Sequence, residues 1–235
     1  MCYNNDGDYM KPIIGILGRV NAINEKDIIF MYDNYRKAVI KYGGIPIMLL
    51  YTKDISYNKT NSKDIGHLNN EQKDNIIRQL QLCNGVIIPG GDRLFDEDIF
   101  ICDYCNKKDI PLLGICMGMQ VMCNYKNNNK NIKIENHNSD SNYKHLVKID
   151  KNSRLFDILK ESEILVNSLH NYKVSNEGDY DAVGFNEDTI EAIEKKENLF
   201  NIGFQWHPEK NYDKDLNSEK IFNSFIEAAK SKSYE

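Results

Sequence analysis

Short apolar runs alternate with amphipathic stretches through the first half of the chain. Four apolar runs bounded by turn residues have the length and composition of buried parallel strands: 12–18, 45–50, 86–88 and 112–115. Three stretches between them carry apolar residues at helical spacing: 28–42, 72–82 and 95–107. This β-α-β-α order predicts a three-layer α/β sandwich, with a central, mostly parallel sheet and helices on both of its faces.

The second half has a different pattern. Its apolar segments are short and favour strands: 145–149, 163–169, 180–185, 189–194 and 201–205. An amphipathic helix carrying Ile221, Phe225 and Ala229 follows them, whereas the polar stretch 51–70 predicts a loop. No internal repeat or linker is evident, so we expect residues 1–235 to form a single domain, with residues 1–11 flexible.

Charge and hydropathy exclude several functional classes. The net charge of −5 gives no electrostatic footprint for nucleic acid, and no apolar run approaches the roughly 20 residues that a membrane span needs. Met1 to Lys11 is polar and acidic rather than basic and then apolar, which argues against a signal peptide. We therefore expect a cytoplasmic protein that binds neither nucleic acid nor membrane.

Six cysteines are too few in 235 residues for a disulfide scaffold. Cys102 and Cys105 form a CDYC pair, but no second pair or nearby histidine completes a metal site, and the segment reads as a helix. We expect neither a metal nor another cofactor. His67, His137 and His145 are interpreted as structural histidines.

Cys116 has the most informative surroundings of any residue. An apolar strand runs into it, and Gly114 and Gly118 lie two residues to either side. This G-x-C-x-G pattern is typical of a nucleophile elbow, a sharp strand-to-helix turn that exposes the nucleophile above a sheet. The N-terminus of the following helix would favour a thiolate. The segment alone also allows a buried structural cysteine.

A base for this nucleophile is available in the segment FQWHPE. It supplies His207, with Glu209 two residues further on. Residues i and i+2 of an extended chain lie on one face, so the carboxylate can reach the imidazole and fix its tautomer. The distance along the chain from Cys116 is no objection, because the fold assembles such groups.

Four motifs occur in one order along the chain: Pro89-Gly90-Gly91, 114–120 (GICMGMQ), 167–170 (NSLH) and 205–209 (QWHPE). This set resembles the class I glutamine amidotransferase superfamily, which implies a flavodoxin-like, class I glutamine amidotransferase-like fold. Within it, the opening segment IIGILGR and the polar insert at 51–70 look more like the γ-glutamyl hydrolase branch, which includes γ-glutamyl-γ-aminobutyrate hydrolases. No synthase domain is attached, which points the same way.

The resemblance implies roles for matching residues. Cys116 would be the nucleophile, His207 the general base and acid, and Glu209 its orienting carboxylate. The oxyanion hole would combine the backbone N–H of Met117 with one from Gly90 or Gly91. Gln120, Ser168, Leu169 and His170 would hold the glutamyl group. The implied reaction cleaves a γ-glutamyl amide through a glutamyl thioester.

Three hypotheses follow. The first is a stand-alone hydrolase of a small-molecule γ-glutamyl conjugate, with a homodimer left open. The second is a glutaminase subunit that supplies ammonia to a separate synthase partner. The third is a binding protein on the same fold, which the intact Cys116, His207 and Glu209 disfavour. The amine half of the substrate should lie against 51–70 and 92–98. Arg19 and Arg93 either contact a substrate anion or belong to the surface.

Overall fold

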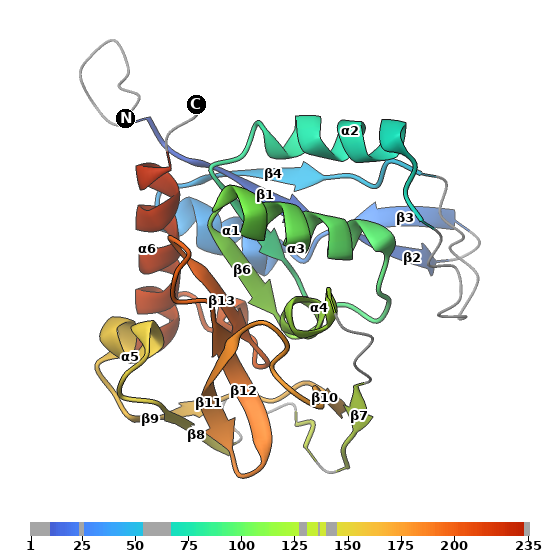
Figure 1. The fold of residues 1–235 in the computed structure, drawn as a ribbon. Coiled ribbons are helices and arrows are strands. Elements are labelled where there is room, and N and C mark those ends of the chain that lie inside the picture. Colours follow the sequence, from blue (N-terminus) through green and yellow to red (C-terminus); the bar gives the residue numbers. More distant parts are fainter. Residues whose placement is uncertain are drawn as a thin grey trace.

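The computed structural model describes residues 10–23, 26–53, 67–126, 131–135, 137–139 and 145–232. A nine-stranded sheet runs through the molecule, with helices on both faces (Figure 1). The order of its strands is β4 (Ile45–Leu49), β1 (Ile13–Leu17), β5 (Gly85–Ile88), β6 (Leu112–Ile115), β13 (Asn201–Phe204), β12 (Thr189–Glu194), β11 (Asp181–Asn186), β8 (His145–Ile149) and β9 (Glu163–Val166).

The sheet has two halves. From β4 to β13 every neighbouring pair is parallel, and from β13 to β9 every pair is antiparallel. The predicted three-layer α/β architecture is confirmed. The two halves largely match the change in sequence pattern. The parallel strands β4, β1, β5 and β6 are the continuous apolar runs of the first half, whereas β13 and the antiparallel strands are the later short segments.

Two apolar cores lie on opposite faces of the sheet. One packs under the helices α1 (Asp33–Lys41), α5 (Arg154–Leu159) and α6 (Leu216–Ser231). The other packs under α2 (Asn70–Leu80), α3 (Asp96–Lys108) and α4 (Met117–Asn124). Strand β5 contributes side chains to both cores, since Ile87 belongs to the first core and Val86 and Ile88 belong to the second.

The predicted helix over 28–42 is wrong in its first turn. Residues Lys26–Phe30 form strand β3, which pairs antiparallel with β2 (Arg19–Ile23), and the helix begins at Asp33. Ile28, Ile29 and Phe30 favour a strand as β-branched and aromatic residues, and here they face cross-strand partners. Apolar spacing alone could not distinguish the two structures.

Several short elements have no apolar run long enough to be predicted. They are β7 (Ile132–Lys133), which pairs with β10 (Tyr172–Lys173), the helix α5, and the 3₁₀ turn η1 (Pro208–Lys210). Residues 1–9 and 54–66 lie outside the described residues, so the flexible segment 1–11 and the insert 51–70 fall largely there. The single-domain assignment stays a prediction.

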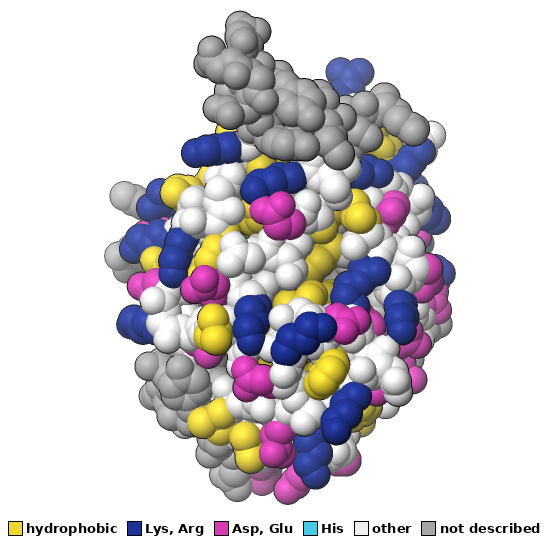
Figure 2. Space-filling view, turned by 90° about the vertical axis from the view of Figure 1, so that its left-hand side faces the viewer, with side chains coloured by type: hydrophobic (Ala, Val, Ile, Leu, Met, Phe, Trp, Pro, Cys, Tyr) yellow, Lys and Arg dark blue, Asp and Glu magenta, His cyan; other side chains and the backbone are white. Residues whose placement is uncertain are grey.

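The surface on the α6 side carries charges of both signs. Figure 2 shows lysine and arginine interspersed with aspartate and glutamate over this face, without a broad region of one sign. This agrees with the net charge of −5, which gives no basic footprint. Among the helices of the described residues, none combines the length and apolar character that crossing a membrane requires.

Candidate active site

Cys116 lies in a strained turn between the end of β6 and the first residue of α4. Its φ of 53° and ψ of −106° are unfavourable for a residue with a side chain. The flanking glycines make this turn possible. A Cβ on Gly118 would stand 1.9 Å from the carbonyl oxygen of Ile88, and one on Gly114 2.3 Å from a sulfur atom. The elbow predicted from G-x-C-x-G is present.

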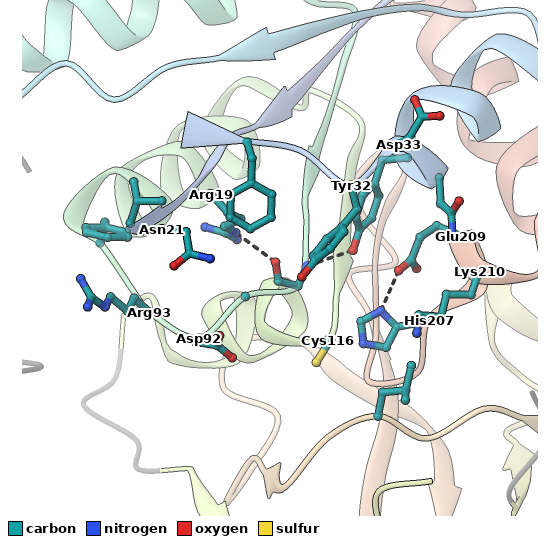
Figure 3. Close-up of a pocket in the computed structure, with 18 residues that line it drawn as sticks. Arg19, Asn21, Tyr32, Asp33, Asp92, Arg93, Cys116, His207, Glu209 and Lys210 are labelled. Carbon is teal, nitrogen blue, oxygen red and sulfur yellow. Dashed lines mark hydrogen bonds and ion pairs between the residues drawn. The ribbon is translucent and has the colours of Figure 1, made fainter. Parts of the chain in front are cut away.

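His207 follows β13 and is held from two directions. Asn167 clamps its backbone: the His207 N–H donates to Asn167 Oδ1 at 2.9 Å, and Asn167 Nδ2 donates to the His207 carbonyl at 2.8 Å. The ring nitrogen Nδ1 lies 2.7 Å from Oε1 of the buried Glu209. With Nδ1–H donating to this carboxylate, Nε2 is left for the hydrogen bond with Cys116. Figure 3 shows the sulfur, the imidazole and the carboxylate in sequence.

The environment of His207 stabilises its protonated form. Burial alone would lower the pKa of the imidazole, but the charge of Glu209 and the hydrogen bonds with Cys116 and Glu209 outweigh it and raise that pKa to about 10. An imidazolium between a thiol sulfur and a carboxylate can give a proton to a leaving group and take one back from water. The arrangement is therefore equipped for nucleophilic acyl transfer.

The loop Pro89-Gly90-Gly91 follows β5 and borders the same site. The Gly90 N–H donates to the hydroxyl of the buried Tyr35 at 3.1 Å. A Cβ on Gly90 would lie 3.1 Å from His207 Cε1, and one on Gly91 3.1 Å from Met117 Cε. The loop thus passes directly over the elbow, and glycine at 90 and 91 allows this close approach.

Arg19 anchors this loop, a role that the sequence did not suggest. Its guanidinium donates to the carbonyl oxygens of Pro89 at 2.6 Å and Gly90 at 3.2 Å, and to Asp98 Oδ1 at 2.5 Å. Arg19 is 4% exposed and Asp98 is fully buried. Arg19 lines the cavity, but its donors bind protein groups. Arg19 is therefore not a surface residue, and its hydrogen bonds to the protein leave it without a dedicated role in binding a substrate anion.

A cavity of about 660 Å³ opens in front of Cys116 and His207. Its walls come from the β2–β3 hairpin, the start of α1 and the loop after β5 (Figure 3). Besides the Cys116 thiol, the cavity is lined by ionisable side chains of both signs of charge, among them Asp33, Asp92, Arg93 and Lys210. Such a volume is ordinary for a small-molecule site and exceeds what a primary amide alone would fill.

Of the residues predicted to hold the glutamyl group, Leu169 lines this cavity. The Gln120 side chain instead bonds Gln205, Asn131 and the carbonyl of Tyr172. Ser168 and His170 are buried and do not belong to the described lining, and His170 faces Glu191. The substrate roles of these four residues stay predictions.

The other described cysteines are poor nucleophiles. Cys83, Cys102, Cys105 and Cys123 are all buried, whereas Cys116 is partly exposed. Burial raises the pKa of Cys102 to about 12, so its thiol stays protonated at neutral pH. The CDYC pair lies on α3, inside the second core, as the helical interpretation predicts.

Comparison with known proteins gives consistent results. The profile of the family described as peptidase C26 matches residues 12–209. A Rickettsia prowazekii protein, provisionally named glutamine amidotransferase-like, is 26% identical over 84% of this chain and 88% of its own. A Schizosaccharomyces pombe protein, provisionally named a glutamine amidotransferase, is 29% identical over 83% of this chain and 81% of its own.

Longer relatives and solved structures match as well. The CTP synthase of Hydrogenobaculum is 27% identical over 65% of this chain, and the aligned part is only 35% of that enzyme. The CTPS glutaminase domain of Trypanosoma brucei, solved with bound acivicin, superposes with a TM-score of 0.64 at 17% identity, covering 95% of this chain and 96% of that one. A Thermoplasma acidophilum protein, provisionally named as one subunit of a GMP synthase, gives 0.63 at 17% identity over 94% and 95%. These two structures share the fold.

Proposed function

This chain belongs to the peptidase C26 family, and from that premise we propose that it hydrolyses the γ-glutamyl amide bond of a small γ-glutamyl amine. The observation that carries the proposal is the Cys116–His207–Glu209 arrangement that lines the cavity, with Nδ1 of His207 2.7 Å from the carboxylate. The family supports an amide hydrolase or amidotransferase. The γ-glutamyl amine substrate is the finer part of the proposal.

The proposed reaction has two halves. The Cys116 thiolate attacks the γ-carbonyl carbon, and the oxygen of the tetrahedral intermediate accepts hydrogen bonds from the N–H groups of Met117 and Gly91. We assign Gly91 rather than Gly90 because the Gly90 N–H already donates to Tyr35. The C–N bond breaks as protonated His207 gives its proton to the leaving amine.

The second half consumes the glutamyl thioester. Neutral His207 removes a proton from a water molecule, which attacks the thioester carbonyl, and the same oxyanion donors act again. Glutamate leaves, the C–S bond breaks, and Cys116 returns as a thiolate beside the imidazolium. Glu209 holds the ring in the tautomer that both halves need, since its carboxylate accepts from Nδ1–H.

The cavity favours an amine larger than ammonia. Its volume of about 660 Å³ has room for an acceptor side, and the chain itself supplies the walls through the β2–β3 hairpin. Asp92, Arg93 and Lys210 offer charges that can bind polar groups on a leaving amine. A glutaminase subunit, by contrast, would need a surface that seals against its synthase and passes ammonia inward.

The alternative function is a glutaminase subunit for a separate synthase. One observation favours it: the relatives include CTP synthases and the solved structures include a CTPS glutaminase domain. This chain spans between about a third and about a half of the CTP synthases it matches.

A turnover panel separates the two functions. Purified protein without a partner is supplied with γ-glutamyl amines of different size and charge and with free glutamine, and the released glutamate is measured. We expect at least one γ-glutamyl amine to be cleaved with a higher kcat/KM than glutamine. Negligible turnover of every amine, together with glutaminase activity that depends on an added synthase, would favour the alternative.

A further inference from the structure

A second cluster of ionisable side chains lies away from Cys116, around Glu191 of β12. Glu191 is fully buried, and three imidazoles face its Oε1 atom: Nε2 of His137 at 3.2 Å, of His145 at 3.3 Å and of His170 at 3.5 Å. The rings also contact one another, with centroids 4.6 Å apart for His137 and His145, and 4.5 Å apart for His137 and His170.

Hydrogen bonds with good geometry account for only part of this arrangement. Only His137 Nε2 has hydrogen-bond geometry toward Glu191 Oε1. Within the described part of the chain, both ring nitrogens of His145, Nε2 of His170 and Oε2 of Glu191 are buried without a hydrogen-bond partner. A buried polar atom without a partner is costly. Four such atoms in one cluster point to a ligand that several of them bind together.

The spacing fits a four-coordinate transition metal. Zn²⁺ binds imidazole nitrogen and carboxylate oxygen at about 2.0–2.2 Å, which in a tetrahedron places the ligand atoms about 3.3–3.5 Å apart. Two of the three distances from Glu191 Oε1, 3.3 and 3.5 Å, fall in this range, and the third, 3.2 Å, is just below it. The ligand atoms of His137, His145 and Glu191 lie within 4.8 Å of one another. His170 is not part of that set, but its Nε2 lies 3.5 Å from Glu191 Oε1 and can serve as a fourth ligand.

The protein also orients one of these ligands. His170 Nδ1 lies 3.1 Å from the carbonyl oxygen of Tyr172, so Nδ1–H donates there and the lone pair of Nε2 points to the cluster. Metal-bound histidines almost always use their second nitrogen in this way. His170 and Glu191 are buried and His137 is partly exposed, which leaves a route for an ion from the His137 side.

We propose that His137, His145, His170 and Glu191 form a binding site for Zn²⁺ or a similar divalent transition metal. The set of three neutral imidazoles and one carboxylate suits this class of ion rather than Ca²⁺ or Mg²⁺, which prefer oxygen. A bound ion would connect His145 at the start of β8 and His170 just before β10 to Glu191 on β12. His170 is also three residues from Asn167, which clamps His207, and adjoins Leu169 of the cavity wall. The site is therefore structural and supports one side of the active-site cavity.

Metal content and affinity test the proposal without using turnover. The full chain is stripped with a chelator, dialysed, and titrated with ZnCl₂ by calorimetry, with bound metal counted by elemental analysis. We expect one equivalent of Zn²⁺. At a free concentration about a hundredfold above Kd, the Tm should rise by about 5–10 °C. Absence of stoichiometric binding would overturn the proposal.

Variants locate the ion. The substitution His137→Gln removes the most accessible ligand and should weaken Zn²⁺ binding at least about tenfold, with His145→Gln as a second removal. His67→Gln is the matched control, because His67 is an exposed histidine outside the cluster. The variant Cys116→Ser tests the competing site at the thiol. Unchanged affinity in both cluster variants, or binding lost only with Cys116→Ser, would refute the cluster as the site. Far-UV circular dichroism checks that each variant is folded.

Discussion

The parallel and antiparallel halves of the sheet each gather a set of chemically active side chains, in different ways. In the parallel half, Cys116 takes its geometry from its own neighbours, because Gly114 and Gly118 permit the strained turn. In the antiparallel half, His145 and Glu191 meet because β8, β11 and β12 are neighbours in the sheet, with a register shift in the β11–β12 pairing beside Glu191. The geometry of Cys116 is therefore set by residues next to it in the sequence, whereas the histidine cluster depends on contacts between distant segments.

This difference predicts which substitutions abolish chemistry and which disturb only structure. Changes in the elbow should remove activity even where the fold survives. Changes of similar size in the antiparallel half should lower stability and leave the reaction largely intact.

The largest effect is expected for Cys116→Ala. Because Cys116 supplies the attacking sulfur, we expect turnover of the best γ-glutamyl amine to fall at least about 10⁴-fold. The Tm should stay within a few degrees of the parent. Cys123→Ala, at a buried cysteine on the helix α4 that follows Cys116, is the matched control and should keep most of the activity. Retained activity in Cys116→Ala, or its loss in Cys123→Ala alone, would contradict the assignment.

His207→Ala should be nearly as damaging, and Glu209→Gln about 10–100-fold milder. The alanine removes the proton carrier for both halves of the reaction. Glutamine keeps an oxygen that can accept from His207 Nδ1–H. Steady-state kinetics on one γ-glutamyl amine measure both variants. Equal losses with intact folds would assign the Glu209 carboxylate a more direct part in proton transfer.

A pair of glycine substitutions tests the contrast between the halves directly. In Gly118→Ala the new Cβ would meet a backbone carbonyl at 1.9 Å, so we expect a loss of about 3 kcal/mol in stability and of most activity. In Gly184→Ala on β11 the Cβ would meet the Ala192 Cβ at 2.8 Å and the Ala192 backbone nitrogen at 3.2 Å, which is a less severe contact than that of Gly118. That variant should lose about 1–2 kcal/mol and keep kcat within about threefold. Urea unfolding measures the stability of both variants, and steady-state kinetics measure their kcat. Similar losses of kcat in Gly118→Ala and Gly184→Ala would contradict the proposed difference between the two halves of the sheet.

Arg19→Lys should act on the loop over the elbow. Lysine keeps a positive charge near the buried Asp98, but its single ammonium cannot also reach the two carbonyls of Pro89 and Gly90 with the geometry of a guanidinium. We expect kcat to fall about 10-fold with little change in KM, because the loop donates to the transition state. Arg78→Lys on the exposed side of α2 is the control and should have no effect. A change in KM alone would instead place Arg19 in substrate binding.

The smallest effect is a shift in pH dependence. The pKa of His207 is raised from 6.5 to about 10, so its protonated form is favoured in the folded chain. Its contribution to stability is complete below 6.5 and is lost as the pH rises through about 10. The rate of amine release should decline over the same alkaline range. Glu209→Gln removes the charge that raises this pKa, so the decline should begin at lower pH; identical profiles would contradict this origin of the shift.

The sequence predicts the parts of the molecule that are encoded locally. The parallel strands and the elbow follow from apolar runs and from G-x-C-x-G, and the segment WHPE places Glu209 two residues after His207. The β2–β3 hairpin was not predicted, because the apolar residues from Ile28 to Met31 also fit a helix. The role of Arg19 in anchoring the loop was not predicted, because its partners Pro89 and Asp98 are about 70 to 80 residues away in the sequence.

The histidine cluster could not be predicted for the same reason. Its members stand at 137, 145, 170 and 191, with no spacing typical of a metal motif, so His137 and His145 looked structural and no metal was expected. His145 and Glu191 lie on strands whereas His137 and His170 lie outside them, so only the folded chain brings the three histidines to one carboxylate. Our structural inference of a Zn²⁺ site therefore departs from the expectation of a metal-free protein.

Capture of the glutamyl thioester tests the central claim most directly. The protein is mixed with its best γ-glutamyl amine, quenched in acid within one turnover, and analysed by intact mass and peptide mapping. We predict a mass increase of one glutamyl group on the peptide that carries Cys116, and its absence in Cys116→Ala. Full turnover with no adduct on Cys116 at any quench time, or an adduct on another residue, would contradict the account.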